Sequence, residues 1–559
     1  MGTISDKLMR IINTKEDIRQ ALISKGYDVP TSIPFKEYAK MISDLPCRVD
    51  SFPDIEGIVA RYSALGLTNE QMATNPVWVD KTGNGHDLQL KNFSWKGMSG
   101  VGGYGDENYQ TFYKFTLDDY VFIASPPGVK HMNFTFRVTG LQPGNKLTLA
   151  FFGTTNTVYG TWDKDGIYTV DADIVEAGKP TYFYNGYGAT RGEFTIEILP
   201  LYPGALVFDG VDDYGTCNNF PVLTKEKGYT VVALRQWIEE KNDSTALVSN
   251  CKNWNQDGAF LFEYNNLRIN FLNVAISFGH VSPVDRGKSP FSYQTSKLYN
   301  GKNIKPGSFI GSNELVVGKG NKDFLTVSNA AIWEIVILDH DATEEELTKI
   351  KDYFVKTYPW LFPDQAWTVV GKTNEDEDRA TIANITGNGN NLVLSNSGFA
   401  EGSGYNEEGE YAGYLVTDGV DDKITSSTFE MGNDWTVIGD WELINTGKND
   451  NAGIVKFDSI VIYNYNPILI NIKNGRNNLI PDQNTVNAIC SDGRIYSKDW
   501  KESIYNEETE STSKNFLTIG YSGNVYTKIA FKNLAIYPTV LSREDCIKAY
   551  NYLQTLKAK

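Results

Sequence analysis

Two short acidic segments are the residue groups best suited to chemistry. The sequence D-G-V-D-D occurs at residues 209–213 and again at 418–422. Three carboxylates within five residues could supply the hard oxygen ligands that Ca²⁺ prefers. Alternatively, each Asp-Gly pair makes a tight turn, and the other carboxylates cap backbone N–H groups or face water; we favour this turn and expect no cofactor. The residues of the alternative metal site are Asp209, Asp212, Asp213, Asp418, Asp421 and Asp422.

Two tryptophans in polar segments are candidates for contacts with a glycan. One lies in N-W-N-Q-D-G at 253–258 and the other in T-W-D-K-D-G at 161–166. Pyranose C–H faces stack on aromatic rings, while sugar hydroxyls need amide or carboxylate partners. The alternative is that each ring packs over the end of a β-sandwich. The candidate glycan-binding residues are Trp254, Asn255, Asp257 and Trp162.

Length, charge and cysteine usage limit the classes of protein. The chain has 559 residues, enough for several domains, and its 69 acidic residues outnumber 52 Lys and Arg, which disfavours a nucleic-acid partner. No stretch has the apolar length of a membrane span, and the charged start at 1–8 does not resemble a signal peptide. The five cysteines form no C-x-x-C pair. We therefore expect synthesis in a reducing cytoplasm without membrane insertion.

An internal duplication sets the domain organisation. The segment that starts T-G-N-G at 82–92 recurs at 386–396, D-G-V-D-D recurs 209 residues later, and the strand-like run 332–338 recurs at 531–537. The first copy has 95 more residues between its first two motifs, and period-two alternation there predicts an inserted β domain. We predict a mainly β protein with two jelly-roll sandwiches. The predicted domains are 47–357, with an insert at about 107–203, a proline-stiffened linker at 358–365, and 366–559.

The first 46 residues show helical periodicity instead. Three short amphipathic helices are predicted, and helices of this length are marginal alone. A self-contained helical cap on the first β domain is one interpretation; we favour an anchor that docks on a larger assembly or joins copies of the chain into a trimer or dimer. The predicted anchor residues are Ile4, Leu8, Ile11, Ile18, Leu22, Phe35, Tyr38 and Ile42.

These motifs resemble two known groups of proteins. The D-G-V-D-D segments, the late strand at 331–337 and the T/S-x-x-E/D helix that follows are similar to laminin G-like domains of the concanavalin A-like lectin and glucanase superfamily, over residues 57–357 and 366–557. The opening helical segment, residues 77–85 and the Gly-rich 95–104 resemble virion proteins of tailed phages, particularly the crAss-like group. This resemblance implies a fibre or appendage, although the fold alone does not imply sugar binding.

The acidic residues do not match the hydrolases of this superfamily. Laminarinase-type enzymes carry E-x-D-x-E on one strand, which places two carboxylates about 5 Å apart. No such triplet occurs, and the acidic run at 375–378 is typical of a solvated surface. We therefore predict that the chain is not an enzyme.

The predicted function is that of a structural virion protein whose lectin-like domains attach to host surface polysaccharide, with other virion proteins as partners of the N-terminal helices. Two alternatives are a capsular polysaccharide depolymerase, which could recruit carboxylates from different strands, and a cell-surface adhesin.

Overall fold

The computed structural model describes most of the chain beyond residue 51. The described ranges are 52–104, 112–115, 120–124, 131–141, 145–151, 157–173, 180–185, 194–224, 226–239, 245–250, 260–264, 289–303, 312–320, 326–409, 411–444, 453–457, 460–463, 469–472, 476–479, 486–497, 500, 502–504, 517–522 and 525–558, with Lys15 and Arg19. The predicted helical anchor at 1–46 lies outside these residues, apart from Lys15 and Arg19. The described part is mainly β, which confirms the predicted fold class.

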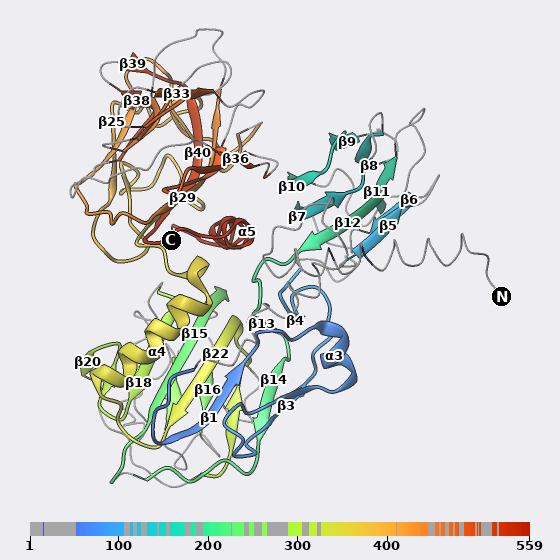
Figure 1. Cartoon of the computed structure of the whole chain (residues 1–559), viewed down its shortest axis with the longest axis vertical. Coiled ribbons are helices and arrows are strands. Elements are labelled where there is room, and N and C mark those ends of the chain that lie inside the picture. The colour runs from blue at the N-terminus through green and yellow to red at the C-terminus, as the bar shows by residue number, and fades with distance from the viewer. Residues whose placement is uncertain are drawn as a thin grey trace, which may run out of the picture.

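The first β-sandwich consists of two antiparallel sheets (Figure 1). One sheet has the order β20 (Lys302–Asn303), β19 (Leu298–Tyr299), β18 (Phe291–Thr295), β15 (Thr230–Glu239), β22 (Asn329–Leu338), β13 (Leu206–Asp209) and β4 (Gly100–Val101), with β1 (Ile58–Ser63) also on β22. The other has the order β17 (Leu261–Phe262), β16 (Val248–Ser249), β21 (Leu315–Val317), β14 (Tyr214–Cys217), β3 (Leu88–Lys91) and β2 (Val77–Trp78). The apolar sides of both sheets meet in one core.

The second sandwich repeats this pairing. Its first sheet contains β26 (Gly404–Tyr405), β27 (Leu415–Val416), β40 (Ile529–Tyr537), β29 (Thr436–Leu443), β34 (Val486–Cys490), β35 (Arg494–Ser497) and β36 (Glu502–Ile504), with β23 (Gln365–Thr368) on β40. Its second sheet contains β24 (Thr381–Ile382), β25 (Leu392–Ser395), β28 (Lys423–Ser426), β37 (Thr518–Ile519), β30 (Gly453–Phe457), β31 (Ile460–Tyr463), β32 (Leu469–Ile472) and β33 (Arg476–Leu479), and a separate pair joins β38 (Tyr521–Ser522) to β39 (Val525–Tyr526). Apart from β32 and β33, which extend the second sheet of the second sandwich, the described strands of these sheets have the same order in the two sandwiches, in agreement with the duplication seen in the sequence.

Strands between β4 and β13 pair with one another in two further sheets. One has the order β10 (Gly166–Asp173), β7 (His131–Thr139), β12 (Phe194–Leu199) and β5 (Phe112–Phe115); the other has β6 (Tyr120–Ala124), β11 (Pro180–Asn185), β8 (Leu147–Phe151) and β9 (Thr157–Trp162). Phe134, Phe136, Phe183 and Ile196 are almost fully buried in the core of this inserted domain.

Three α-helices lie among the described residues of the two sandwiches. Helix α3 (Asn69–Thr74) is short, whereas α4 (Glu344–Thr357) and α5 (Arg543–Gln554) each follow the last long strand of a sandwich. The Thr343 and Ser542 side chains accept hydrogen bonds from backbone N–H groups in the first turns of α4 and α5, as expected for N-cap residues. Together with the 3₁₀ turn η2 (Pro359–Leu361), helices α4 and α5 form the junction between the two sandwiches.

A continuous apolar cluster joins the domains at this junction. Trp360 of η2 is 3% exposed, and its carbonyl accepts a hydrogen bond from the Tyr537 hydroxyl of β40 at 3.0 Å. Figure 1 shows α5 between the two sandwiches and beside the inserted sheets. Glu544 of α5 forms an ion pair with Arg137 of the inserted domain. The stiff aromatic linker is thus a buried part of the interface, which holds the sandwiches together.

Candidate functional site

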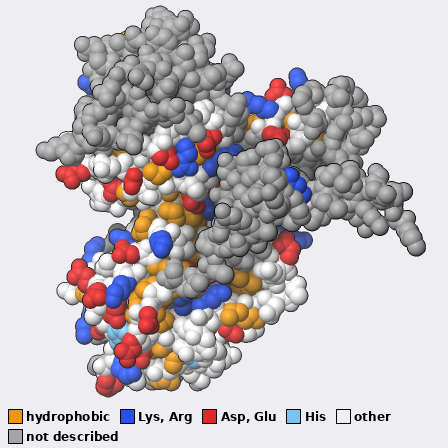
Figure 2. All heavy atoms as spheres, in the orientation of Figure 1, with side chains coloured by type: hydrophobic (Ala, Val, Ile, Leu, Met, Phe, Trp, Pro, Cys, Tyr) orange, Lys and Arg blue, Asp and Glu red, His pale blue; other side chains and the backbone are white. Residues whose placement is uncertain are grey.

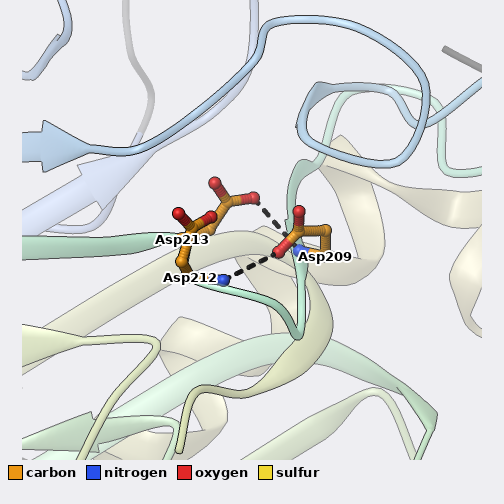
Figure 3. Close-up of side chains that lie close together, drawn as sticks. All are labelled: Asp209, Asp212 and Asp213. Atoms are coloured by element: carbon orange, nitrogen blue, oxygen red, sulfur yellow. Dashed lines mark hydrogen bonds between the residues drawn. The ribbon is translucent and has the colours of Figure 1, made fainter. Parts of the chain in front are cut away.

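The first acidic turn connects β13 of one sheet to β14 of the other, so it lies at one end of the first sandwich. Figure 3 shows its three aspartate side chains beside one another. Asp209 Oδ1 accepts hydrogen bonds from the backbone N–H groups of Val211 and Asp212, at 2.7 and 3.4 Å. Asp213 Oδ2 accepts one from the Asp209 N–H at 3.1 Å, and its Oδ1 accepts one from the Ser99 hydroxyl at 3.0 Å. Two of the three carboxylates, those of Asp209 and Asp213, therefore stabilise the turn by accepting hydrogen bonds from its own backbone.

The second acidic turn repeats these internal hydrogen bonds and adds one from the Asp422 N–H. Asp418 Oδ1 accepts from the N–H groups of Val420, Asp421 and Asp422 at 2.7 to 3.3 Å, and Asp422 Oδ2 accepts from the Asp418 N–H at 2.8 Å. The valine at each tip is about 70% exposed. The turn is thus a repeated structural unit at the same end of each sandwich.

The carboxylates of each turn lie close enough to affect one another. In each copy, one oxygen from each of the three side chains lies within 4.8 Å of the others, which a cation could bridge. Burial, followed by the charge of Asp209, raises the pKa of Asp213 to about 7. Burial likewise raises the pKa of Asp422. The hydrogen bonds fit the turn that we favoured, while the alternative of Ca²⁺ binding stays untested.

A neighbouring loop supports each turn in the same way. The Asn92 side-chain amide donates to the Asp212 carbonyl at 3.0 Å, and Asn396 donates to Asp421 at 3.1 Å. Both asparagines have left-handed backbones, with φ of 69° and 66°. Both lie at the ends of the duplicated segments 82–92 and 386–396, so the sequence repeat carried a signal for this support.

A second polar cluster lies between the sheets of the first sandwich and was missed by the sequence analysis. Arg235 of β15 donates from Nε to both carboxylate oxygens of Glu263, at 3.0 and 2.9 Å, and both side chains are almost fully buried. Glu263 also accepts from the Trp237 indole N–H at 2.6 Å, the Ser292 hydroxyl at 2.6 Å and the Tyr299 hydroxyl at 3.0 Å. The one available signal was an arginine inside the apolar run 230–238.

The hydrogen bonds fix the charge states in this cluster. Burial alone would raise the pKa of Glu263, but the charge and hydrogen bonds of Arg235, with those of Ser292 and Trp237, hold it below the usual value. Burial and the Glu263 charge raise the pKa of Tyr299. The carboxylate is therefore ionised and the phenol protonated at neutral pH, which suits positioning of side chains better than proton transfer.

The predicted glycan contacts have different placements. Trp162 lies at the end of β9, half-buried, with its ring over Gly160 and edge-to-face on Phe136 at 4.9 Å. This packing covers a glycine and extends the core of the inserted domain, so the structure gives Trp162 a packing role. Trp254, Asn255 and Asp257 lie outside the described residues, and a glycan contact at any of the four stays a prediction.

Comparisons with known proteins give distant matches only. No family model matches the chain, and no curated protein matches it. Among solved structures, a sialidase from Trypanosoma rangeli in complex with sialic acid is 8% identical at a TM-score of 0.26, covering 69% of this chain and 68% of that chain. The binding domain of Paraclostridial Mosquitocidal Protein 1 is 11% identical at 0.19, covering 57% and 85%. In two further sialidase complexes, this chain spans less than half of the solved chain.

These matches correct one prediction. The chain was predicted not to be an enzyme, but the first solved structures that it resembles are those of a sialidase, an enzyme. The prediction is therefore withdrawn. At TM-scores near 0.25, the same matches assign no active site to this chain.

Among the described residues, no helix has the length and apolar character needed to cross a membrane.

Proposed function

We propose that the chain is an appendage protein of a tailed-phage particle that presents its β-sandwich domains to glycans on the host surface. The observation that carries the proposal is the duplicated sandwich, in which each copy keeps the same hydrogen-bonded turn at its end with an exposed tip. The resemblance of residues 77–85 and 95–104 to virion proteins supports the particle as the location.

The joint between the sandwiches is suited to such a role. Trp360 and its neighbours in η2 are buried between α4, α5 and β40, so the sandwiches cannot turn about a flexible linker. A rigid pair of domains keeps its contact surfaces at a fixed spacing. Many copies on one particle would strengthen a weak attachment at each site, because linked sites raise the effective concentration.

In this proposal the first 46 residues fasten the chain to other virion proteins and join copies into a trimer or dimer. The amphipathic periodicity of this segment is its support.

Binding of labelled full-length chain to bacterial cells, with purified surface polysaccharide as competitor, tests the proposal. We expect saturable binding that the polysaccharide of the bound strain abolishes and that of an unbound strain does not. The same samples are assayed for released reducing ends, which reports any cleavage. Deletion of residues 1–46 should leave binding by the single chain but abolish its assembly into particles or oligomers. Absence of competition by every polysaccharide would contradict glycan attachment, and unchanged assembly of the truncated chain would contradict the anchor.

A further inference from the structure

The two sandwiches can be compared residue by residue, because their strands pair in the same register. β15 pairs with β22 as β29 pairs with β40, and both pairs have a bulge at the same place, before Arg235 in β15 and before Trp441 in β29. In this register Arg235 corresponds to Trp441, and Trp237 corresponds to Leu443. Residues that differ between the two sandwiches at equivalent positions are therefore not required by the fold.

The charged cluster of the first sandwich has no charged counterpart in this register. Trp441 and Leu443 are 3% and 6% exposed and belong to the apolar core of the second sandwich. The β16–β17 pair corresponds to β30–β31, which places Tyr463 at the position of Glu263. The second sandwich therefore forms with Trp, Leu and Tyr where the first has Arg, Trp and Glu.

The buried pair of Arg235 and Glu263 carries a cost in folding free energy, although the second sandwich forms without such a pair. Removing two charges from water carries a desolvation penalty, and replacing a buried ion pair by apolar residues is often neutral or stabilising. In addition, Glu263 has a left-handed backbone with φ of 54°, an unfavourable conformation for a residue with a side chain. Such a cost points to a role beyond stability.

The cluster fixes the orientation of Trp237. The indole N–H donates to Glu263 Oε2 at 2.6 Å, and the carboxylate that receives it is itself fixed by Arg235 and by the Tyr299 hydroxyl. Trp237 is only half-buried, at the edge of the sandwich core. A rigid, partly exposed indole loses little conformational entropy when a ligand packs on it.

We propose that Trp237, near the C-terminal end of β15, is the stacking surface of a glycan-binding site on the first sandwich, and that it takes the C–H face of an uncharged pyranose. Glu263 and Arg235 are positioning residues that hold the ring. Because their charges neutralise each other, the cluster gives no preference for a charged sugar. This inference rests on the proposed function and assigns glycan binding to the first sandwich, at residues that the second lacks.

The test transplants the residues of the second sandwich into the first. The full-length triple variant Arg235→Trp, Trp237→Leu, Glu263→Tyr and the single variant Trp237→Leu are titrated with purified host polysaccharide by calorimetry. We expect both to bind up to about tenfold more weakly than the unaltered chain, since one stacking contact is worth up to about a factor of ten. The matched control is Trp95→Leu, which removes another half-buried tryptophan packed against the same core and should leave affinity unchanged.

A ¹⁹F NMR measurement on the unaltered chain tests the inference even if a variant fails to fold. The unaltered chain is labelled with 5-fluorotryptophan, and the ¹⁹F resonance of Trp237 is assigned as the one missing from Trp237→Phe. We expect this resonance to shift saturably with added polysaccharide. If the chain binds the polysaccharide while the Trp237 resonance and the affinity of Trp237→Leu stay unchanged, the inference is wrong and the proposed function stands. If the chain binds no polysaccharide, the proposed function fails, and the inference fails with it.

Discussion

The stability of the first sandwich should depend on pH through Asp213. Its side chain is 0% exposed, and burial with the charge of Asp209 raises its pKa from 3.8 to about 7. The folded protein therefore keeps this carboxyl protonated at pH values where the unfolded chain has released the proton. The free energy of unfolding is highest below about pH 4, falls as the pH rises towards 7, and is then constant as far as this group is concerned. A shift of about three units corresponds to a loss of up to about 4 kcal/mol.

The substitution Asp213→Asn tests this reasoning, because the amide stays neutral throughout. Asn keeps one acceptor for the Asp209 N–H, and its NH₂ group can donate to the Ser99 hydroxyl, so the direct cost of the change is about 1 kcal/mol. The free energy of unfolding of the variant minus that of the unaltered chain should rise by up to about 4 kcal/mol between pH 4 and pH 8. Other titrating groups cancel in this difference.

Unfolding by guanidinium is monitored by circular dichroism at several pH values, in the presence of a chelator. The two curves give the difference in free energy of unfolding between the variant and the unaltered chain. Asp212→Asn is the matched control, since this side chain lies in the same turn but is exposed. Its charge is the last and smallest of the influences on the pKa of Asp213, so its curve should stay close to parallel with that of the unaltered chain. Parallel curves for Asp213→Asn as well would refute the reasoning.

Three further predictions concern the scaffold. Glu334→Ala leaves the buried Arg61 without its ion-pair partner and should lower the free energy of unfolding by about 3–5 kcal/mol, whereas an unchanged denaturation midpoint would contradict this. Trp360→Ala leaves a cavity in the apolar cluster between the sandwiches and should lower the free energy of unfolding by about 3–5 kcal/mol. The linker should also become sensitive to brief protease treatment; resistance equal to that of the unaltered chain would show that Trp360 is not needed for a rigid linker. Gly210→Ala should lower the melting temperature more than Gly204→Ala. Both glycines have φ near 75°, but only Gly210 has another side chain within 3 Å of the added carbon. Equal decreases in melting temperature would contradict the importance of this close contact.

Short-range patterns were sufficient to predict the fold class. The alternation of apolar residues, the repeated D-G-V-D-D turns and the capped helices at Thr343 and Ser542 are local features, and local hydrogen bonding forms them in the structure. The bridging of each turn by Asn92 or Asn396 was not predicted, although the repeat contained both residues. The contact joins residues more than a hundred positions apart in the first copy, and no spacing rule links them.

The sequence by itself determined that the chain is mainly β, acidic and duplicated, because turn residues and period-two alternation depend on near neighbours in the chain. Only the tertiary structure decided that Arg235 and Glu263 pair between two sheets and fix Trp237, and that the linker at Trp360 is buried in a shared core. Those contacts depend on how strands from different sheets, and helices from different domains, come together. Such long-range contacts depend on the whole fold, and they produce no repeating pattern along the sequence from which they could be predicted.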